Sequence, residues 1–241
     1  LGEPGLAGHG RRPGLNRGAQ SRGLQGALGS WTVAQRRTTG LSGLDAQLGG
    51  GVPEGSVHVL LGEPMNAFEL FAYHFAAGGT KDGQVRYLAT EQTTDEVEAG
   101  VARVGGDVKN VQAVALPHKG KMVLPDLKDG FRYVIDDITA VVADLGFEAT
   151  LKRLQELRTQ ARDAKTELLI TCTVGLLEPH EEIRLKLWAD GVLDLGFDRQ
   201  GFGLYPFLKV TKMRGVPESS RFILFKETKA GLFMESTRRV F

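Results

Sequence analysis

The stretch that decides the fold is TTGLSGLDAQLGGGVPEGSVHVLLGEP, residues 38–64. It contains the apolar run SVHVLLG (56–62), whose length and unbroken hydrophobicity are typical of a strand buried on both faces. Directly beyond it, AFELFAYHFAAGG (67–79) predicts a mostly apolar helix that ends at glycines. A buried strand that leads through a short turn into a helix is the repeating unit of a parallel α/β sheet.

The alternation of strand and helix continues toward the C-terminus. Thr93 and Glu96 form a capping box for a helix that ends near Gly105. Leucines recur along one face of a second helix, residues 149–165. Short apolar strands between such helices predict a mainly parallel sheet covered on both faces. The predicted strands are VRYLAT (85–90), VQAVAL (111–116), FRYVIDD (131–137) and ELLITCT (167–173).

After Trp188 the pattern becomes entirely β. Turn residues at Gly201, Gly203, 215–217 and 230–231 separate the runs DGVLDLGF, FLKVTKM, RFILFKE and GLFMES. We expect these strands to extend the same sheet in antiparallel fashion. The predicted fold class is therefore α/β, a three-layer sandwich with a mainly parallel sheet and antiparallel C-terminal strands, formed as one domain by residues 38–241.

Residues 1–37 differ in amino-acid composition from the rest of the chain. This leader is rich in Gly and Arg and carries a net charge of +5, which leaves −4 on residues 38–241 because the whole chain is +1. Such a segment buries too little apolar surface to offset its ordering entropy, so we expect it to be disordered. The alternative is that its arginines bind nucleic acid or an acidic partner.

Several classes of protein are disfavoured by composition. Cys172 is the single cysteine, which excludes an internal disulfide and a cysteine-based zinc site. The five histidines show no metal-ligand spacing. No apolar run approaches the roughly 20 residues of a membrane helix, and the first residues lack the apolar region of a secretory signal. We therefore expect a cytoplasmic protein without a membrane partner.

Three segments together resemble the KaiC-like members of the RecA superfamily. Residues 38–64 are similar to the segment that leads into the family's phosphate loop, and RYVIDDITAVV (132–142) resembles its Walker B strand. WADGVLDL and LKVTKMRG, within 188–215, resemble its late strands and its Lys-x-Arg pair. The resemblance covers 38–241 and implies a RecA-like core, assembled as a ring or other oligomer, with ATP and Mg²⁺ between subunits.

The same resemblance implies a phosphate loop that has lost its chemistry. Family members use a loop lysine for the β- and γ-phosphates and a Ser/Thr hydroxyl for Mg²⁺. Here Phe68 stands at the lysine and Glu69 at the hydroxyl, while Met65 and Ala67 replace small glycines. The implied cofactor-binding segment of this degenerate Walker A motif reads Gly62, Glu63, Pro64, Met65, Asn66, Ala67, Phe68 and Glu69.

These replacements oppose nucleotide binding on physical grounds. The cradle loses its main positive charge, and Glu69 adds a negative charge where the phosphates would lie. Two like charges about 4 Å apart repel by roughly 4 kcal/mol at an effective dielectric constant near 20. Asn66 and Glu69 also have the spacing of a helix N-cap pair, so we expect the helix end to be capped by the protein itself.

The remaining candidates for catalysis are carried over from the family by position. Asp136 would orient Mg²⁺ as metal ligand and catalytic acid, or it caps the next turn. Glu91 would polarise the attacking water, but its neighbour Gln92 cannot take a proton. Lys212 and Arg214 would reach the γ-phosphate of a neighbouring subunit. Without phosphate, they serve an interface or bind the carboxylates of Glu63, Glu69 or Asp136.

Three functions follow as hypotheses. The favoured one is a catalytically degenerate KaiC-like protein, a regulatory or scaffold subunit that binds no ATP or binds it weakly. It would form a homo-oligomer or a hetero-oligomer with an active paralogue. The second is a slow ATPase that acts as a ring through Glu91 and Asp136 and a neighbour's Lys212 and Arg214. The third is an accessory protein of the recombinase-paralogue type that binds DNA through the arginine-rich leader.

Overall fold

The computed structural model describes residues 2, 35–64, 66–117, 122–128, 130–200, 203–216 and 222–234. The chain divides into two compact units, Leu1–Val33 and Ala34–Phe241, and the second contains every described helix and strand. The predicted disordered leader therefore lies almost wholly outside the described residues, as does Met65 of the predicted loop. Both expectations stay predictions.

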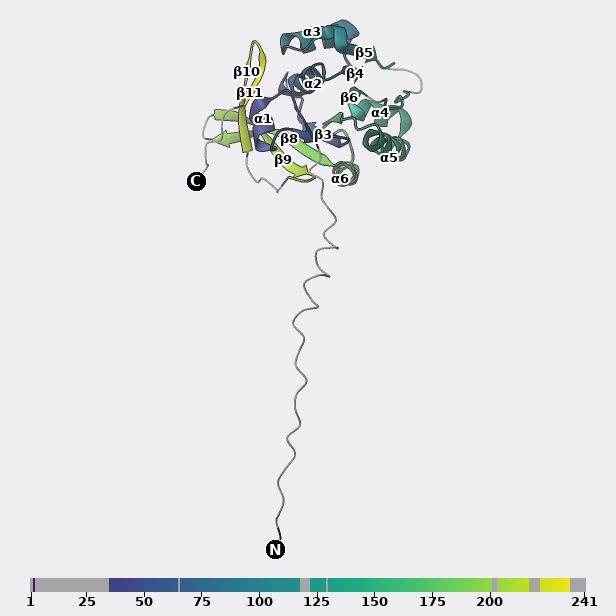
Figure 1. The fold of residues 1–241 in the computed structure, drawn as a ribbon, viewed down its shortest axis with the longest axis vertical. Helices are drawn as coiled ribbons and strands as arrows, with labels where there is room; N and C mark the ends of the chain where they lie inside the picture. The colour runs from purple at the N-terminus through teal and green to yellow at the C-terminus, as the bar shows by residue number, and fades with distance from the viewer. Residues whose placement is uncertain are drawn as a thin grey trace. The chain divides into compact units, whose positions relative to one another are not determined.

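The domain is built on a mixed sheet of nine strands with α-helices on both faces, which confirms the predicted fold class (Figure 1). The strand order is β11-β10-β9-β8-β3-β7-β6-β4-β5, and the pairs from β8 to β5 are all parallel. The strands are β3 (Val57–Gly62), β4 (Gln84–Ala89), β5 (Val111–Ala115), β6 (Phe131–Asp136), β7 (Leu168–Thr173), β8 (Gly191–Gln200), β9 (Gly203–Met213), β10 (Phe222–Thr228) and β11 (Gly231–Met234).

The helices divide into two layers because alternate residues of each strand face opposite sides of the sheet. Leu60 packs in the core beneath the layer that holds α2, whereas Val59 and Leu61 pack beneath the layer of α5. No helix among the described residues is long and apolar enough to cross a membrane. The helices are α1 (Ser42–Gln47), α2 (Asn66–Gly79) and α3 (Thr94–Arg103) in one layer and α4 (Ile138–Leu145), α5 (Phe147–Asp163) and α6 (Pro179–Trp188) in the other.

One topological expectation was wrong for a single strand. β8 was predicted to begin the antiparallel extension, but it pairs with β3 in parallel, with His58 opposite Gly191. The reason is α6, which the sequence pattern did not predict: Pro179 opens it and Glu178 and Glu181 cap it. A helix between β7 and β8 makes a crossover connection, and such a connection brings the chain back in the same direction. In the nine-stranded sheet that the structure describes, the antiparallel pairs are β8–β9, β9–β10 and β10–β11.

The segment 38–54 owes its distinctive sequence to packing. Asp45 accepts hydrogen bonds from the Thr38 hydroxyl at 2.5 Å and the Thr39 amide at 2.8 Å, which fixes α1 onto the chain before it. A Cβ atom on Gly40 would lie 1.9 Å from the carbonyl oxygen of His74, and one on Gly51 would lie 2.0 Å from that of Arg37. Both glycines also have positive φ, 82° and 114°, so no other residue fits there without strain.

The two-stranded ribbon β1 (Arg36–Arg37) and β2 (Val52–Pro53) lies before the main sheet in the chain. At the other end of the domain, β11 is tied to α2 by one buried hydrogen bond. The backbone amide of Leu232 donates to Nε2 of His74 at 2.9 Å, and burial lowers the pKa of this imidazole. The last described strand is thus fixed to the helix that follows the predicted loop.

Candidate functional site

The carboxyl ends of the central parallel strands meet at one edge of the sheet, where α/β proteins place their binding sites. A cavity of about 420 Å³ lies there, which we call the carboxyl-edge cavity. It brings together several of the predicted site residues, because β3, β4 and β6 each end at this edge. Its lining residues are Pro64, Phe68, Glu69, Glu91, Gln92, Asp136, Asp137 and Thr173.

The lining of the carboxyl-edge cavity is strongly acidic. Of the lining residues that the structure describes, four of eight are Asp or Glu, and none of these eight is Lys, Arg or His. A nucleoside triphosphate carries several negative charges of its own, and a site for it normally supplies lysine, arginine or a metal ion in compensation. Among the described residues, no group of three or more His, Cys, Asp or Glu side chains has the arrangement of a metal site.

Phe68 decides the character of the predicted loop. Its side chain is only 6% exposed. A Cβ atom on Gly62 would lie 3.0 Å from Cδ2 of Phe68 and 3.2 Å from Cβ of Leu195. Gly62 is therefore needed to let the aromatic ring pack against the end of β3.

The rest of the loop lies as follows. Glu63, Pro64 and Glu69 are exposed, and Ala67 is buried in the core beneath α2. α2 begins at Asn66, which is therefore the first helical residue. The cap prediction had placed Asn66 one position earlier, as the residue before the helix. Assigned helix ends vary by a residue, and the side chain of Asn66 lies outside the described residues. The predicted cap between Asn66 and Glu69 stays a prediction.

Asp136, the predicted metal ligand, has internal hydrogen-bond donors at both carboxylate oxygens. The hydroxyl of Thr171 donates to Oδ1 at 2.5 Å, and the hydroxyl of Tyr87 donates to Oδ2. Burial raises the pKa of Asp136 to about 6, although these two hydrogen bonds act in the opposite direction. The carboxylate is held by β4 and β7, on either side of its own strand, and both its oxygens are occupied.

Asp137 takes the capping role that the sequence left open for Asp136. Its Oδ1 accepts from the amide of Thr139 at 2.8 Å and caps α4, and its Oδ2 accepts from the amide of Thr173 at 2.9 Å and from the hydroxyl of the same residue. The peptide bond between Asp136 and Asp137 is cis. Thr171 and Thr173, which flank Cys172 in β7, thus each donate to one carboxylate of the pair.

Glu91 and Gln92 follow β4 and line the cavity, as the sequence predicted. Glu91 is exposed, whereas Gln92 accepts a hydrogen bond from the hydroxyl of Tyr73 at 3.0 Å. Tyr73 and Tyr87 pack against each other with ring centroids 5.9 Å apart. The sequence analysis did not single out these tyrosines. Their signal is a hydroxyl in otherwise apolar segments, YLA in β4 and FAYHF in α2.

Lys212 and Arg214 lie near the opposite edge of the sheet. Met213 pairs with Gly191, and Gly191 lies opposite His58 at the amino end of β3. Arg214 contacts Asp190 at 2.5 Å, and the ammonium of Lys212 donates to the carbonyl oxygens of Lys186 and Leu187 at the end of α6. Within one chain they therefore do not bind Glu63, Glu69 or Asp136. Their predicted role toward a neighbouring subunit stays a prediction.

The chain was compared with known proteins. Residues 36–228 match the profile of DUF7125, described as a family of unknown function. The chain belongs to this family. It is also 30% identical to UPF0273 protein PH0284 of Pyrococcus horikoshii over 154 residues, a match that spans 60% of the chain and 57% of that relative. It is 24% identical to a UPF0273 protein of Aeropyrum pernix, over 84% of the chain and 94% of that relative.

A solved structure confirms the fold that the sequence motifs predicted. The crystal structure of KaiC-like protein PH0186 from Pyrococcus horikoshii superimposes with a TM-score of 0.67 at 19% sequence identity. The match covers 84% of this chain and 99% of that protein. At this identity the likeness establishes a KaiC-like fold.

Proposed function

We propose that this chain is a KaiC-like protein without ATP hydrolysis that serves as a regulatory or scaffold subunit. The observation that carries the proposal is Phe68. At the position of the family's lysine it is 6% exposed and packs against Gly62 and Leu195. A buried aromatic ring cannot neutralise phosphate charge, and it leaves this position without the cation that the family uses there.

The electrostatics of the carboxyl-edge cavity support the same proposal. Glu69, Glu91 and the pair Asp136–Asp137 surround the space that a triphosphate would need. Hydrogen bonds from Thr171 and Tyr87 already occupy Asp136, so coordination of a metal ion through water would have to compete with both. We infer that the domain keeps the KaiC-like scaffold and uses its surfaces, with itself or an active paralogue as partner.

The proposal is tested by isothermal titration of the wild-type protein with MgATP, alongside a hydrolysis assay and light scattering. We expect no binding at micromolar concentration, no turnover and a defined assembly mass. The informative variant is the double substitution F68K/E69T, which restores both family residues, with E69T alone as the matched control. If the scaffold is otherwise intact, only the double variant gains affinity for MgATP.

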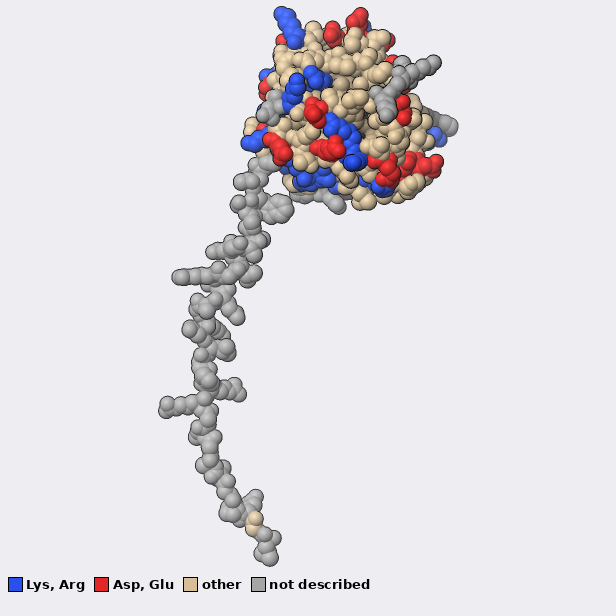
Figure 2. Space-filling view, turned by 90° about the vertical axis from the view of Figure 1, so that its right-hand side faces the viewer, with Lys and Arg blue, Asp and Glu red and all other residues tan. Residues whose placement is uncertain are grey.

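The same experiment has outcomes that would contradict the proposal. Micromolar binding of MgATP by the wild-type chain contradicts the proposal, and turnover in addition supports the slow ATPase that the sequence left as an alternative. For the DNA-binding alternative, the face shown in Figure 2 carries Lys and Arg interspersed with Asp and Glu, without a broad basic area. That alternative depends on residues 1–37, and its test is salt-sensitive DNA binding that is lost when they are deleted.

A further inference from the structure

A cluster of arginines lies at the edge of the sheet where the amino ends of the parallel strands meet, which we call the amino edge. It is centred on Asp190, between the end of α6 and the start of β8, whose side chain is 1% exposed. The amide of Asp190 donates to the carbonyl oxygen of Val57 at 2.9 Å, and its Oδ2 accepts from the amide of Val57 at 3.3 Å. Because Val57 is the first residue of β3, this carboxylate is fixed to the central strand.

Three arginines contact the other oxygen, Oδ1, of this one carboxylate. Nη2 of Arg158 and Nη2 of Arg214 each lie 2.5 Å from it, and Nη2 of Arg162 lies 3.5 Å from it. Arg158 and Arg162 are four residues apart on α5 and therefore share one face of that helix, whereas Arg214 directly follows β9. We call Arg158, Arg162, Arg214 and Asp190 the arginine cluster.

The arginine cluster holds more positive charge than its acid requires. Burial acts to raise the pKa of Asp190, but Arg158 and Arg214 outweigh it and hold this pKa below its ordinary value, so the carboxylate is ionised at neutral pH. The four residues together sum to +2. The closest nitrogens of Arg158 and Arg214 lie within about 5 Å of each other, since both contact the same oxygen, and like charges repel at that distance.

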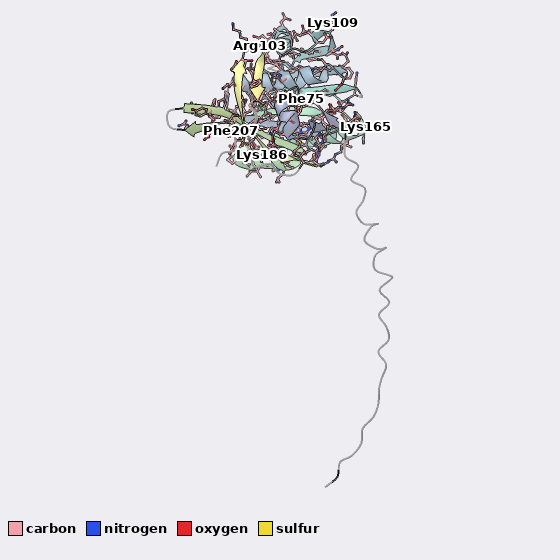
Figure 3. All side chains as sticks on the ribbon, turned by 60° about the vertical axis from the view of Figure 1, so that its left-hand side comes forward. Phe75, Arg103, Lys109, Lys165, Lys186 and Phe207 are labelled. Carbon is pink, nitrogen blue, oxygen red and sulfur yellow. The ribbon has the colours of Figure 1, made fainter. Side chains whose placement is uncertain are left out.

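A lysine adds to the positive charge beside the cluster. Burial lowers the pKa of Lys212, and the positive charges of Arg158 and Arg214 lower it further. The ammonium of Lys212 donates to the carbonyl oxygen of Lys186 at 3.2 Å; Lys186 is labelled in Figure 3. Positive charge therefore extends from α5 across the end of β9 to the end of α6.

The charged residues that follow the three arginines in the chain come in pairs of opposite sign. Beyond the two arginines of α5 the next charged residues are Asp163 and Lys165, and beyond Arg214 they are Glu218 and Arg221. The last two lie outside the described residues. Because each pair sums to zero, neither removes the excess of positive charge in the cluster.

Two members of the cluster are accessible to a ligand. The side chains of Arg162 and Arg214 are 46% and 51% exposed, whereas that of Asp190 is 1% exposed. An anion that approaches from solvent therefore meets guanidinium groups before it meets the carboxylate. Each guanidinium is a planar fork of five N–H donors, and the contact with Asp190 is made through one terminal nitrogen, Nη2.

We propose that the arginine cluster binds the phosphate group of a small molecule. Guanidinium forks match the oxygens of a phosphate group and bind them in pairs. A phosphate monoester carries a charge of about −1.5 to −2 at pH 7, which complements the charge of the cluster. Asp190 is a positioning residue that turns all three guanidiniums toward one point, and this convergence suits a compact anion better than an extended one.

The site is formed within one chain. α5 supplies two of its three arginines, so it differs from the contact with a neighbouring subunit that the sequence predicted for Arg214. The cluster also shares no residue with the described lining of the carboxyl-edge cavity. Its success or failure is therefore independent of the proposed function.

The test is calorimetric titration of the intact chain with inorganic phosphate and with pyrophosphate at constant ionic strength. We expect saturable binding of these anions, with an affinity that falls about tenfold or more in R162M and in R214M, because each variant removes a charged donor. Arg184→Met is the matched control, since Arg184 is a half-exposed arginine on α6 that pairs with Glu148. It should leave the affinity nearly unchanged.

Absence of binding by both anions at about 10 mM overturns the proposal. So does binding that R162M and R214M leave unchanged, or an equal loss in R184M, which would indicate diffuse attraction to surface charge. Either cluster variant is sufficient if the other fails to fold. A short oligonucleotide without a terminal phosphate tests the other source of phosphate. If it binds and pyrophosphate cannot displace it, the cluster contacts a nucleic-acid backbone and the proposal is wrong.

Discussion

The two edges of the sheet differ in the partners that they provide for buried charged side chains. At the carboxyl edge the charged side chains among the described lining residues are all acidic, and the pair Asp136–Asp137 is satisfied by hydroxyl and amide donors from the protein itself. At the amino edge both signs are present, yet Glu167 and Thr166 keep unpartnered atoms among the described residues. At the carboxyl edge the buried acids are held by neutral donors, while at the amino edge the buried carboxylate of Glu167 faces the guanidinium of Arg132.

The largest loss of stability is expected when the buried cation of the amino edge is removed. Arg132→Met should lower the free energy of unfolding by about 4 to 5 kcal/mol, because Glu167 is left as an unpaired buried charge. The carbonyl oxygens of Thr38 and Phe75 also lose their donor. Denaturant unfolding measures the loss. Arg103→Met, at a half-exposed ion pair with Glu227, is the control and should cost less than about 1 kcal/mol.

At the carboxyl edge the corresponding test is Phe68→Ala. We expect a loss of about 3 to 4 kcal/mol in stability, because truncation of a buried phenylalanine removes apolar contacts and leaves a cavity. Phe233→Ala, at a side chain that is 62% exposed, should change stability by less than about 0.5 kcal/mol. A small effect of F68A, similar to that of the control, would mean that the ring of Phe68 does not hold the loop.

A fall in pH changes the free energy of unfolding in opposite directions through two buried groups. Burial lowers the pKa of His58 to about 4, so its contribution to stability is present above pH 6.5 and is lost as the pH falls toward 4. Burial raises the pKa of Asp136 to about 6, so the folded state takes up that proton first and gains stability below pH 6. At roughly 1.36 kcal/mol per pH unit, each effect amounts to about 3 kcal/mol.

The variant Asp136→Asn removes one of these two effects. Its stability should fall from pH 6.5 to pH 4 by about 3 kcal/mol more than that of the wild type, because the loss from His58 is no longer offset. Urea unfolding at several pH values measures the difference between the two curves. Parallel curves would show that Asp136 does not titrate near pH 6 in the folded state.

The smallest effect concerns the hydroxyl that holds Asp136. Tyr87→Phe should cost about 1 kcal/mol and raise the pKa of Asp136 further, because a hydrogen bond that favours the carboxylate is removed. Carbon-detected NMR titration of the carboxyl group follows the pKa directly. Tyr73→Phe, whose hydroxyl donates to Gln92, is the matched substitution and should leave that pKa nearly unchanged.

The fold was largely predictable because its strands are apolar runs that lie between glycine-rich turns in the sequence. The capping box of Thr93 and Glu96 was also confirmed, since it is a local interaction. α6 escaped prediction for a physical reason: Ile183 and Leu187 are exposed while Leu185 and Trp188 are buried, so its apolar residues form no single stripe. Missing α6 led directly to the wrong direction for β8.

The family resemblance predicted which strand ends lie together, but it did not predict the hydrogen-bond partners of their side chains. Pro64, Phe68, Glu69, Glu91 and Asp136 were expected together, and all line one cavity. The partners of Asp136 were not expected, because β4 and β7 lie beside β6 in space although long segments separate them in the chain. The buried ion pair at the amino edge is more distant still from any motif, since Arg132 comes from β6 and Glu167 from the residue before β7.

The hydrogen bond between Leu232 and His74 has a kinetic consequence. Because Nε2 accepts the amide proton of Leu232, the imidazole must be uncharged while β11 is docked on α2. Uptake of a proton turns that acceptor into a donor that faces another donor, and burial lowers the pKa at which this happens. We therefore expect protonation of His74 to weaken the docking of β11, so that amide exchange of Leu232 becomes faster at acidic pH while the central strands remain protected.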